Sequence, residues 1–307
     1  MIHILGAGSM GCLWAAYLNQ SESVRFISNR ANIPRYCAFS LQAPNSQNPT
    51  HHRIPCLSFE EISEPIETLL VCTKSYDALP ALIKLKTKLL EQSNIVLFQN
   101  GLGSHYAIME KFPNRAIFAA VTTEGAHRKS ATEIIHAGRG LTQLGLLNNK
   151  QINFKRLEKL TKSLLKSGLD INQQEIIWPS LWSKLVINCA INPFSAIYNC
   201  PNGEVRQQPL FIEKWPELKH ELVNLIHEAG YPLSKEVLEA RVFDVMDKTK
   251  NNISSMLQDV RLNKRTEIEE INGFAYRFLA SKGIEHQVNK FLWLNVKHLD
   301  SNPILKF

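Results

Sequence analysis

The N-terminal half of the chain alternates short apolar runs with stretches of helical periodicity. Five runs rich in β-branched and apolar residues predict strands at Ile2–Leu5, Val24–Ser28, Thr68–Thr73, Ile95–Gln99 and Ala116–Thr122. Several of these runs have few polar positions, which is typical of a parallel sheet covered by helices on both faces. The helical patterns between them lie at Met10–Asn19, Asp77–Glu91 and His105–Lys111. This alternation predicts a doubly wound α/β sheet.

Two stretches of this half are less regular. Residues 32–65 show the weakest periodicity, with Pro44 and Pro49 at their centre, and we expect a surface excursion with one strand. In residues 133–146, two strand-like runs flank Gly138 and Gly140. That pattern predicts a hairpin that closes one edge of the sheet.

Beyond residue 150 the strand signal largely disappears. Helical patterns cover Phe154–Ser167, Leu181–Ile191, Phe211–Ala229, Lys235–Asn251 and Ile268–Ser281. We therefore expect a domain boundary near Gly168–Gln174, with a dinucleotide-binding domain at 1–170 and an all-helical substrate and catalytic domain at 171–307.

Composition narrows the class of protein. The chain of 307 residues is 44% hydrophobic, carries a formal charge of +7, and spreads its basic residues without a Lys/Arg-rich cluster. This distribution favours small anionic metabolites over nucleic acid, although a mildly basic surface without a specific ligand remains an alternative. The six cysteines form no CxxC pair, which favours free thiols over a disulfide framework or a metal site. We expect a cytoplasmic protein, because no secretory signal or apolar span of membrane length is visible.

A glycine-rich motif follows the first predicted strand. Gly6-Ala7-Gly8-Ser9-Met10-Gly11 has the GxGxxG pattern and opens the first predicted helix. In this context Gly6 permits a tight turn, Gly8 lets a pyrophosphate approach the backbone, and Gly11 allows close packing of the helix on the sheet. The free N–H groups of the helix start favour an anion. The alternative is a glycine-rich turn without a ligand.

The end of the second predicted strand bears on the choice of dinucleotide. Ser28-Asn29-Arg30 stands where an NAD-binding protein usually carries an acidic residue for the ribose hydroxyls. The guanidinium of Arg30 instead suits a 2′-phosphate, so the sequence favours NADP over NAD unless Arg30 is an ordinary solvated residue.

Two further polar residues follow predicted strands. Lys74 comes after the strand at Thr68–Thr73, and Asn100 after the strand at Ile95–Gln99. Ligands of open α/β sheets bind outside the carboxyl ends of the strands, so both residues are candidate contacts of cofactor or substrate. Asn100-Gly101 is equally compatible with ordinary turn chemistry.

One apolar helix carries a polar stripe. Lys184 and Asn188 are four residues apart and share a helical face, with Asn192 one turn further. Pro193 then stops or kinks the helix. An ammonium on a buried helix needs an anionic partner, so Lys184 is a candidate general acid and the two Asn are candidate substrate ligands. The alternative is a lysine that reaches solvent at the helix edge.

A second polar segment lies further along the chain. Residues 251–255 present four polar side chains that could cap a helix or bind a carboxylate. Ser255 and Glu267 are twelve residues apart and do not share a helical face. From spacing alone Glu267 is more typical of a surface acid, like Glu269 and Glu270 beside it.

Taken together, long motifs of this chain resemble the ketopantoate reductase family. The motifs that carry the resemblance are GAGSMG (6–11), CTKSYD (72–77), FQNGLG (98–103), HAGRGLTQLG (136–145), LWSKLVINCAINPFSAIYNCPNGE (181–204) and NNISSMLQDVRLNKRTEIEEINGF (251–274). The match runs through nearly the whole chain, and the last two motifs are the most specific. It implies a Rossmann-type NADP(H)-binding domain, a helical second domain, and NADPH-dependent reduction of a small 2-keto acid in pantothenate biosynthesis.

The resemblance also assigns roles to residues. It implies that Lys184 donates the proton and that Asn188, Asn192 and Asn202 contact the substrate. It implies that Asn252, Ile253, Ser254 and Ser255 hold the pantoate-like end of the substrate, with Ser255 nearest the carboxylate. It places Glu267 by the nicotinamide ribose, Asn100 between cofactor and substrate, and Arg30 and Lys74 near the 2′-phosphate and adenosine.

Two departures concern the identity of the substrate. Residues 31–65 match the family poorly, and Glu285-His286-Gln287-Val288-Asn289 lacks the proline commonly found before Val-Asn. A reductase of another branched 2-keto acid, a polyol-phosphate dehydrogenase and a non-catalytic NADP(H) sensor are the alternatives. We expect a monomer or homodimer with a small-molecule substrate and no nucleic acid, membrane or metal partner.

Overall fold

The computed structural model describes residues 1–28, 33–148, 154–284 and 286–301. Their contacts divide the chain into two compact units. The sheet unit comprises Met1–Gln99 and Ser104–Trp178, and the helical unit comprises Asn100–Gly103 and the chain from Pro179 onward. The expected boundary at Gly168–Gln174 falls before this division, because Asp170–Gln174 still forms a strand of the sheet. The predicted order, an α/β unit followed by helices, is confirmed.

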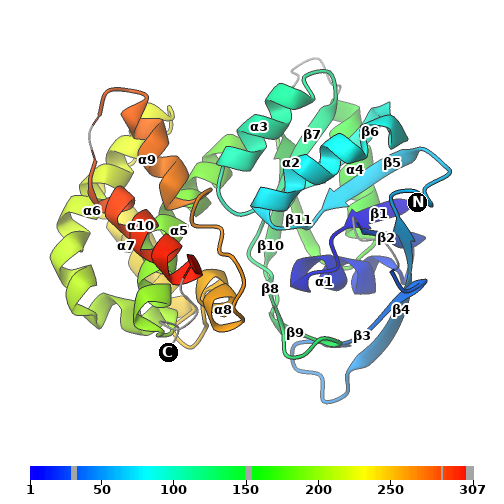
Figure 1. The fold of residues 1–307 in the computed structure, drawn as a ribbon, viewed down its shortest axis with the longest axis horizontal. Helices are drawn as coiled ribbons and strands as arrows, with labels where there is room; N and C mark the ends of the chain where they lie inside the picture. The colour runs from blue at the N-terminus through cyan, green and yellow to red at the C-terminus, as the bar shows by residue number, and fades with distance from the viewer. Residues whose placement is uncertain (29–32, 149–153, 285, 302–307) are drawn as a thin grey trace. The chain divides into compact units, whose positions relative to one another are not determined.

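The sheet unit is built on one long sheet. Its strands are β1 (Ile2–Leu5), β2 (Val24–Ser28), β3 (Tyr36–Gln42), β4 (Thr50–Ser58), β5 (Ile66–Val71), β6 (Leu89–Leu97), β7 (Ala116–Thr122), β8 (Gly125–Arg128), β9 (Glu133–Gly138), β10 (Leu141–Leu146) and β11 (Asp170–Gln174). Its helices are α1 (Ser9–Leu18), α2 (Ser75–Lys84), α3 (Gly103–Lys111) and α4 (Phe154–Leu165), with a 3₁₀ turn, η1, at Lys86–Lys88. The strand order is β11-β10-β7-β6-β5-β1-β2-β4-β3-β9-β8 (Figure 1).

The order of the strands reverses at β1. This strand pairs in parallel with β2 on one side and with β5 on the other. The chain therefore moves in one direction through α1 and in the opposite direction through α2, and right-handed crossovers place these two helices on opposite faces. Such a switch point leaves a crevice at the carboxyl ends of the strands, where ligands of doubly wound sheets bind.

The core on the α1 face is continuous from helix to sheet. Leu13 and Trp14 of α1 pack with Phe26 of β2, Phe118 of β7 and Leu160 of α4, all of them buried. Burial of these side chains holds the start of α1 against the end of β1, which matters for the glycine motif between them.

Residues 32–65 contain more strand than expected. Strands β3 and β4 pair antiparallel from Tyr36↔Pro55 to Leu41↔Thr50, and β4 also pairs with β2. The expectation of one strand was wrong, because proline and polar residues in the connecting turn masked the periodicity of the flanking runs. The poorly matching segment is thus part of the sheet.

The hairpin expected in residues 133–146 does not form. Both strands exist, but β9 pairs with β8 and β3, whereas β10 pairs with β7 and β11. A Cβ at Gly140 would lie 2.4 Å from the carbonyl carbon of Thr123, so this glycine permits two chain segments to cross closely. A glycine pair predicts a turn, but it does not predict which strands will pair.

The helix expected at Asp77–Glu91 is also too long. Helix α2 ends at Lys84, and β6 begins at Leu89, opposite Ile66 of β5. The apolar pair Leu89-Leu90 fits both the helical and the strand period, so pattern alone could not locate the boundary.

Within the described residues, the regular elements of the helical unit are all helices. They are α5 (Trp178–Tyr198), α6 (Pro209–Glu228), α7 (Lys235–Lys248), α8 (Ser255–Arg261), α9 (Asn272–Ala280) and α10 (Val288–Ser301), with a 3₁₀ helix, η2, at Asn202–Gln207. Helices α8 and α10 were not predicted. Pro193 was expected to stop or kink the first of these helices, and it does not stop it, since α5 continues to Tyr198.

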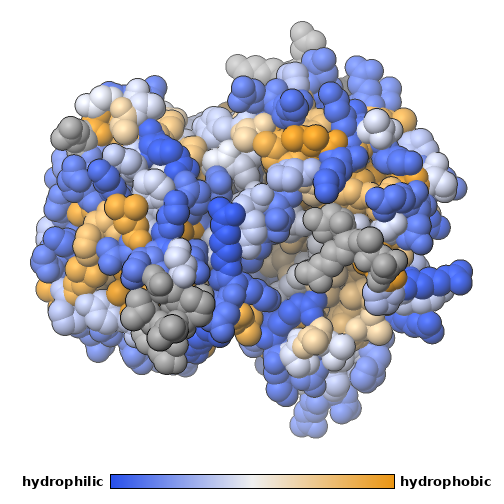
Figure 2. Space-filling view, in the orientation of Figure 1, coloured by the Kyte–Doolittle hydropathy of each residue, from blue (hydrophilic) through white to orange (hydrophobic). Residues whose placement is uncertain are grey.

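The visible face of each unit is mainly polar. Figure 2 shows hydrophilic side chains over most of the visible face, with smaller hydrophobic patches. Among the described helices, none combines the length and the apolar character needed to cross a bilayer.

Candidate active site

The glycine motif forms a tight loop between β1 and α1. Gly6 has a φ of +101°, and a Cβ there would lie 2.9 Å from the backbone nitrogen of Thr73. A Cβ at Gly11 would lie 2.0 Å from the carbonyl oxygen of Gly6. Gly8, in contrast, is exposed, and the nearest atom to its virtual Cβ is 3.8 Å away. Two glycines therefore close the loop, and the third leaves its outer side accessible.

This loop has the properties of an anion site. Gly8 occupies the N-cap position of α1 without a capping side chain, and the first turn of the helix contains no acidic residue. Ala7, Ser9 and Met10 are only partly buried. Backbone N–H groups at such a helix start favour a phosphate, so the loop fits the pyrophosphate of a dinucleotide.

Lys74 and Arg30 were the other cofactor candidates in the sheet unit. Lys74 follows β5 at the N-cap of α2 and is partly buried. Its place after β5, the neighbour of β1, agrees with a position at the switch point. Arg30 lies outside the described residues.

Sequence reasoning missed a buried polar network behind the loop. Nε2 of His136 lies 2.6 Å from Oε2 of Glu124, and Nδ1 of His136 lies 2.9 Å from the hydroxyl of Tyr17 in α1. The side chains of Glu124 and His136 are buried. Arg128 donates a hydrogen bond to the carbonyl oxygen of Ala7 within the glycine motif. The signal was present in the HAGRG motif, whose histidine is His136, but spacing gave it no role.

Lys184 lies on α5, the helix with the polar stripe. It is partly exposed, as is Asn188, whereas Asn192 is only 7% exposed. Desolvation lowers the pKa of Lys184 to about 8, and the nearby carboxylate of Glu267 opposes this shift. A lysine with this pKa exchanges its proton near neutral pH, which is a property of general acids.

Glu267 is not a surface acid, contrary to what its spacing indicated. It is 6% exposed, and its Oε2 accepts a hydrogen bond of 3.2 Å from Nδ2 of Asn100. The backbone adds a second link, because the N–H of Leu102 donates to the carbonyl oxygen of Glu270 at 3.1 Å. The helical unit thus brings Lys184, Glu267 and Asn100 together from three distant parts of the sequence.

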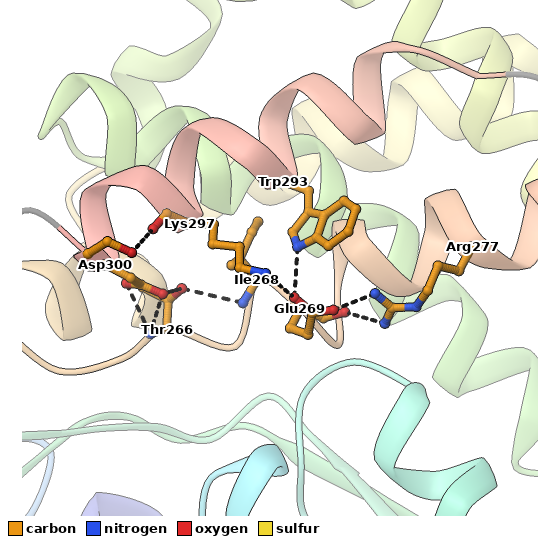
Figure 3. A network of polar contacts seen from close by, with 8 residues as sticks. Thr266, Ile268, Glu269, Arg277, Trp293, Lys297 and Asp300 are labelled. Atoms are coloured by element: carbon orange, nitrogen blue, oxygen red, sulfur yellow. Dashed lines mark hydrogen bonds and ion pairs between the residues drawn. The ribbon is translucent and has the colours of Figure 1, made fainter.

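The segment around Glu267 has no regular secondary structure and is anchored on both sides (Figure 3). Before it, Thr266 donates to the Asp300 carboxylate from its hydroxyl at 2.8 Å and from its N–H at 3.2 Å. After it, Glu269 accepts hydrogen bonds from Arg277 and from Nε1 of Trp293. The expectation that Glu269 is a solvated acid was wrong. These anchors fix the backbone that presents Glu267.

The predicted substrate residues at 252–255 adjoin Asn202. The N–H of Asn202 donates to the carbonyl oxygen of Asn252 at 3.0 Å. Ser254 is buried and caps α8 by accepting from the N–H of Leu257, so it has the capping role that the sequence left open. Asn252 and Ser255 are exposed, and Ile253 is partly buried. Exposed polar side chains at a helix start are available to an anionic ligand.

Family models of the same protein family match both units of the chain. The family model "Ketopantoate reductase PanE/ApbA" matches residues 2–149, and "Ketopantoate reductase PanE/ApbA C terminal" matches residues 177–300. A 2-dehydropantoate 2-reductase of Shigella flexneri is 31% identical over 98% of this chain and 95% of its own length.

Solved structures share the fold. A PanE/ApbA family ketopantoate reductase from Ralstonia eutropha has a TM-score of 0.84 at 21% identity, covering 98% of this chain and 99% of its own. D-mandelate dehydrogenase, in a ternary structure with NADH and anilino(oxo)acetate, has a TM-score of 0.86 at 22% identity and covers 98% of both chains. With two family models spanning most of its residues, the chain belongs to the ketopantoate reductase family of oxidoreductases.

Proposed function

We propose that this enzyme catalyses the NADPH-dependent reduction of 2-dehydropantoate to pantoate, a step of pantothenate biosynthesis. The observation that carries the proposal is the position of Lys184 in the helical unit, where burial lowers its pKa to about 8 and the nearby carboxylate of Glu267 acts on it electrostatically. Curated relatives that are 30% and 31% identical to this chain are 2-dehydropantoate 2-reductases, which supports this substrate.

The glycine loop at residues 6–11 supports a nicotinamide dinucleotide as the cofactor. The open side of Gly8 admits a pyrophosphate, and Lys74 lies after the adjacent strand. When bound, NADPH supplies the hydride that reduces the ketone carbon. The sequence Ser28-Asn29-Arg30, which offers a guanidinium and no carboxylate, favours the 2′-phosphorylated form.

The chain's own residues would supply the proton and the binding contacts. Lys184 stabilises the developing alkoxide and donates its proton to that oxygen. Glu267 keeps Lys184 in its ammonium form, since the carboxylate raises the pKa that desolvation lowers. Polar side chains of the helical unit orient the keto acid, and they are Asn100, Asn188, Asn192, Asn202 and the segment Asn252–Ser255.

The test is a comparison of 2-dehydropantoate turnover with NADPH and with NADH, followed at the nicotinamide absorbance. We expect kcat/KM with NADPH to exceed the NADH value by about tenfold or more, because Arg30 has no 2′-phosphate to bind in NADH. Equal values would contradict the NADP assignment, and no turnover with either would contradict the substrate.

A second candidate is reduction of a different branched or aromatic 2-keto acid. Two observations favour this second candidate. The fold neighbour D-mandelate dehydrogenase was solved with anilino(oxo)acetate, and the sequence before Val288-Asn289 departs from the family pattern. A panel of 2-keto acids at a fixed NADPH concentration separates the two candidates by their kcat/KM values.

Two glycine substitutions test the loop separately for packing and for binding. Gly11→Ala is expected to lower Tm by several degrees, because its Cβ would lie 2.0 Å from a backbone oxygen.

Gly8→Ala has room and should leave Tm unchanged while weakening NADPH binding by about tenfold, since the methyl group occupies the pyrophosphate's approach. Thermal unfolding and fluorescence titration with NADPH measure both, with Gly138→Ala as the control at an open position. Unchanged NADPH affinity in Gly8→Ala would place the pyrophosphate elsewhere.

A further inference from the structure

Proline within α5 leaves one helix carbonyl without its usual partner. Pro193 has no N–H, so it cannot donate to the carbonyl oxygen of Cys189 four residues earlier. The side chain of Asn272 replaces the missing donor, because its Nδ2 lies 3.2 Å from the oxygen of Cys189. Asn272 is the first residue of α9 and is fully buried. A buried carbonyl left unbonded here would carry a desolvation cost.

The amide of Asn272 is held in place by a buried network. Nδ2 of Asn272 also donates to Oδ1 of Asn289 at 3.0 Å. The Glu221 carboxylate accepts hydrogen bonds from Nδ2 of Asn289 at 2.7 Å, from the N–H of Asn289 at 2.9 Å and from the N–H of Val288 at 2.6 Å. Since Glu221, Asn272 and Asn289 are almost completely buried, this network fixes the orientation of the Asn272 amide.

The bonded carbonyl lies within the polar stripe of α5. Cys189 directly follows Asn188 and precedes Asn192 by less than one turn. Asn272, at the other end of the bond, begins the helix that follows the Glu267 segment. The single hydrogen bond therefore links the helix bearing Lys184 to the segment bearing Glu267.

We infer that Asn272 is a positioning residue. Its side chain supplies the hydrogen-bond donor that Pro193 lacks, and it thereby fixes the positions of Asn188 and Asn192 for substrate binding. This role rests on the proposed function of α5. It acts through the backbone of α5, and Asn272 itself need not touch the substrate.

The kinetic signature distinguishes positioning from simple stabilisation. Asn272→Ala removes the hydrogen bonds to Cys189 and to Asn289. Loss of the bond to Cys189 is expected to raise KM for 2-dehydropantoate about tenfold and to leave KM for NADPH unchanged. A variant that was only less stable would lose active enzyme and keep both KM values. Asn272→Leu, which is closer in volume, serves as the second variant.

Restoring the backbone donor is the decisive test. Pro193→Ala supplies an N–H for the oxygen of Cys189, so adding it to Asn272→Ala should recover part of the lost Tm and part of the rise in KM. Ser195→Ala is the matched control, since its hydroxyl also donates to a buried carbonyl, that of Cys200 at 2.8 Å, but not to the one that Pro193 leaves open. Pro193→Ala should not recover the Tm of that control.

The outcomes separate this inference from the proposed function. If Pro193→Ala recovers Tm and KM in the Asn272→Ala background alone, the result supports the role of Asn272 as the replacement donor. If Pro193→Ala gives no recovery there, or recovers Tm equally in the Ser195→Ala background, the inference is overturned. If neither Asn272 variant folds alone, a folded double variant is the expected result and an unfolded one contradicts it. The Tm measurements need no substrate, so a failure of 2-dehydropantoate turnover would leave this test intact.

Discussion

Lys184→Ala is expected to lower kcat for 2-dehydropantoate reduction by about 10²–10⁴-fold, the usual contribution of a positioned general acid. The ammonium is expected both to stabilise the alkoxide and to supply its proton, and no alanine can do either. Steady-state kinetics with NADPH at neutral pH measure the loss. The KM for NADPH should change little, because the glycine loop lies in a different part of the chain.

The fold should survive this substitution. The pKa of Lys184 lies well below that of an exposed lysine, so holding the ammonium on α5 costs folding free energy. Lys219→Ala is a suitable control, since Lys219 is a lysine of the helical unit that forms an ion pair with Glu239 at 2.7 Å. We expect its kcat to remain within about twofold of the parent value. A Lys184→Ala enzyme that retained most of its turnover would remove Lys184 from the mechanism.

Glu267→Gln is expected to shift the alkaline limit of activity to lower pH. The carboxylate of Glu267 raises the pKa of Lys184, so its neutralisation should let desolvation lower that pKa below about 8. A smaller fraction of the enzyme would then hold the proton at pH 8, and kcat/KM there should fall by about tenfold or more. The glutamine can still accept the hydrogen bond from Asn100, so the loss reports mainly the charge.

The measurement is kcat/KM for 2-dehydropantoate as a function of pH in the parent and the variant. Glu239→Gln is the matched control, because it removes the carboxylate that binds Lys219 and Trp215, remote in sequence from α5. Its profile should superimpose on that of the parent. A Glu267→Gln profile with the parent's alkaline limb would show that Glu267 does not govern the proton on Lys184.

The local patterns of the sequence predicted the central strands of the sheet and the glycine loop well. The motif at residues 6–11 is interpretable because strand, glycines and helix are contiguous, and β1 and β7 have the predicted bounds. Strand pairing was less accessible. The runs of β9 and β10 were visible, but their partners are chosen by contacts far apart in sequence, which periodicity does not encode.

The same limit applies to the candidate site, where local spacing could group residues on one helix but not residues from distant segments. Lys184, Asn188 and Asn192 could be grouped from helical spacing, since they lie on one helix. Glu267 could not, because its burial depends on Asn100, on the anchoring of Thr266 by Asp300 and on the binding of Glu269 by Trp293. Spacing therefore indicated a surface acid, and only the family resemblance assigned it to the site.

The helix through Pro193 shows the limit of a local rule. Proline predicts that a helix stops or kinks because it removes a donor, and the helix need not stop where another part of the chain supplies that donor. Here Asn272 does so from a different helix. The signal was available in the motif EEINGF, but its meaning depends on the fold.

The central claim is that the ammonium of Lys184 protonates the reduced substrate. Its most direct test is kcat/KM with 2-dehydropantoate and NADPH from about pH 6 to about pH 10, for the parent and for Lys184→Arg, whose guanidinium stays protonated throughout. We predict that parent activity declines above about pH 8, and that the lower activity of the arginine variant lacks this decline. Parent activity that stayed constant to about pH 10, or an arginine variant with the same alkaline limb, would contradict the claim.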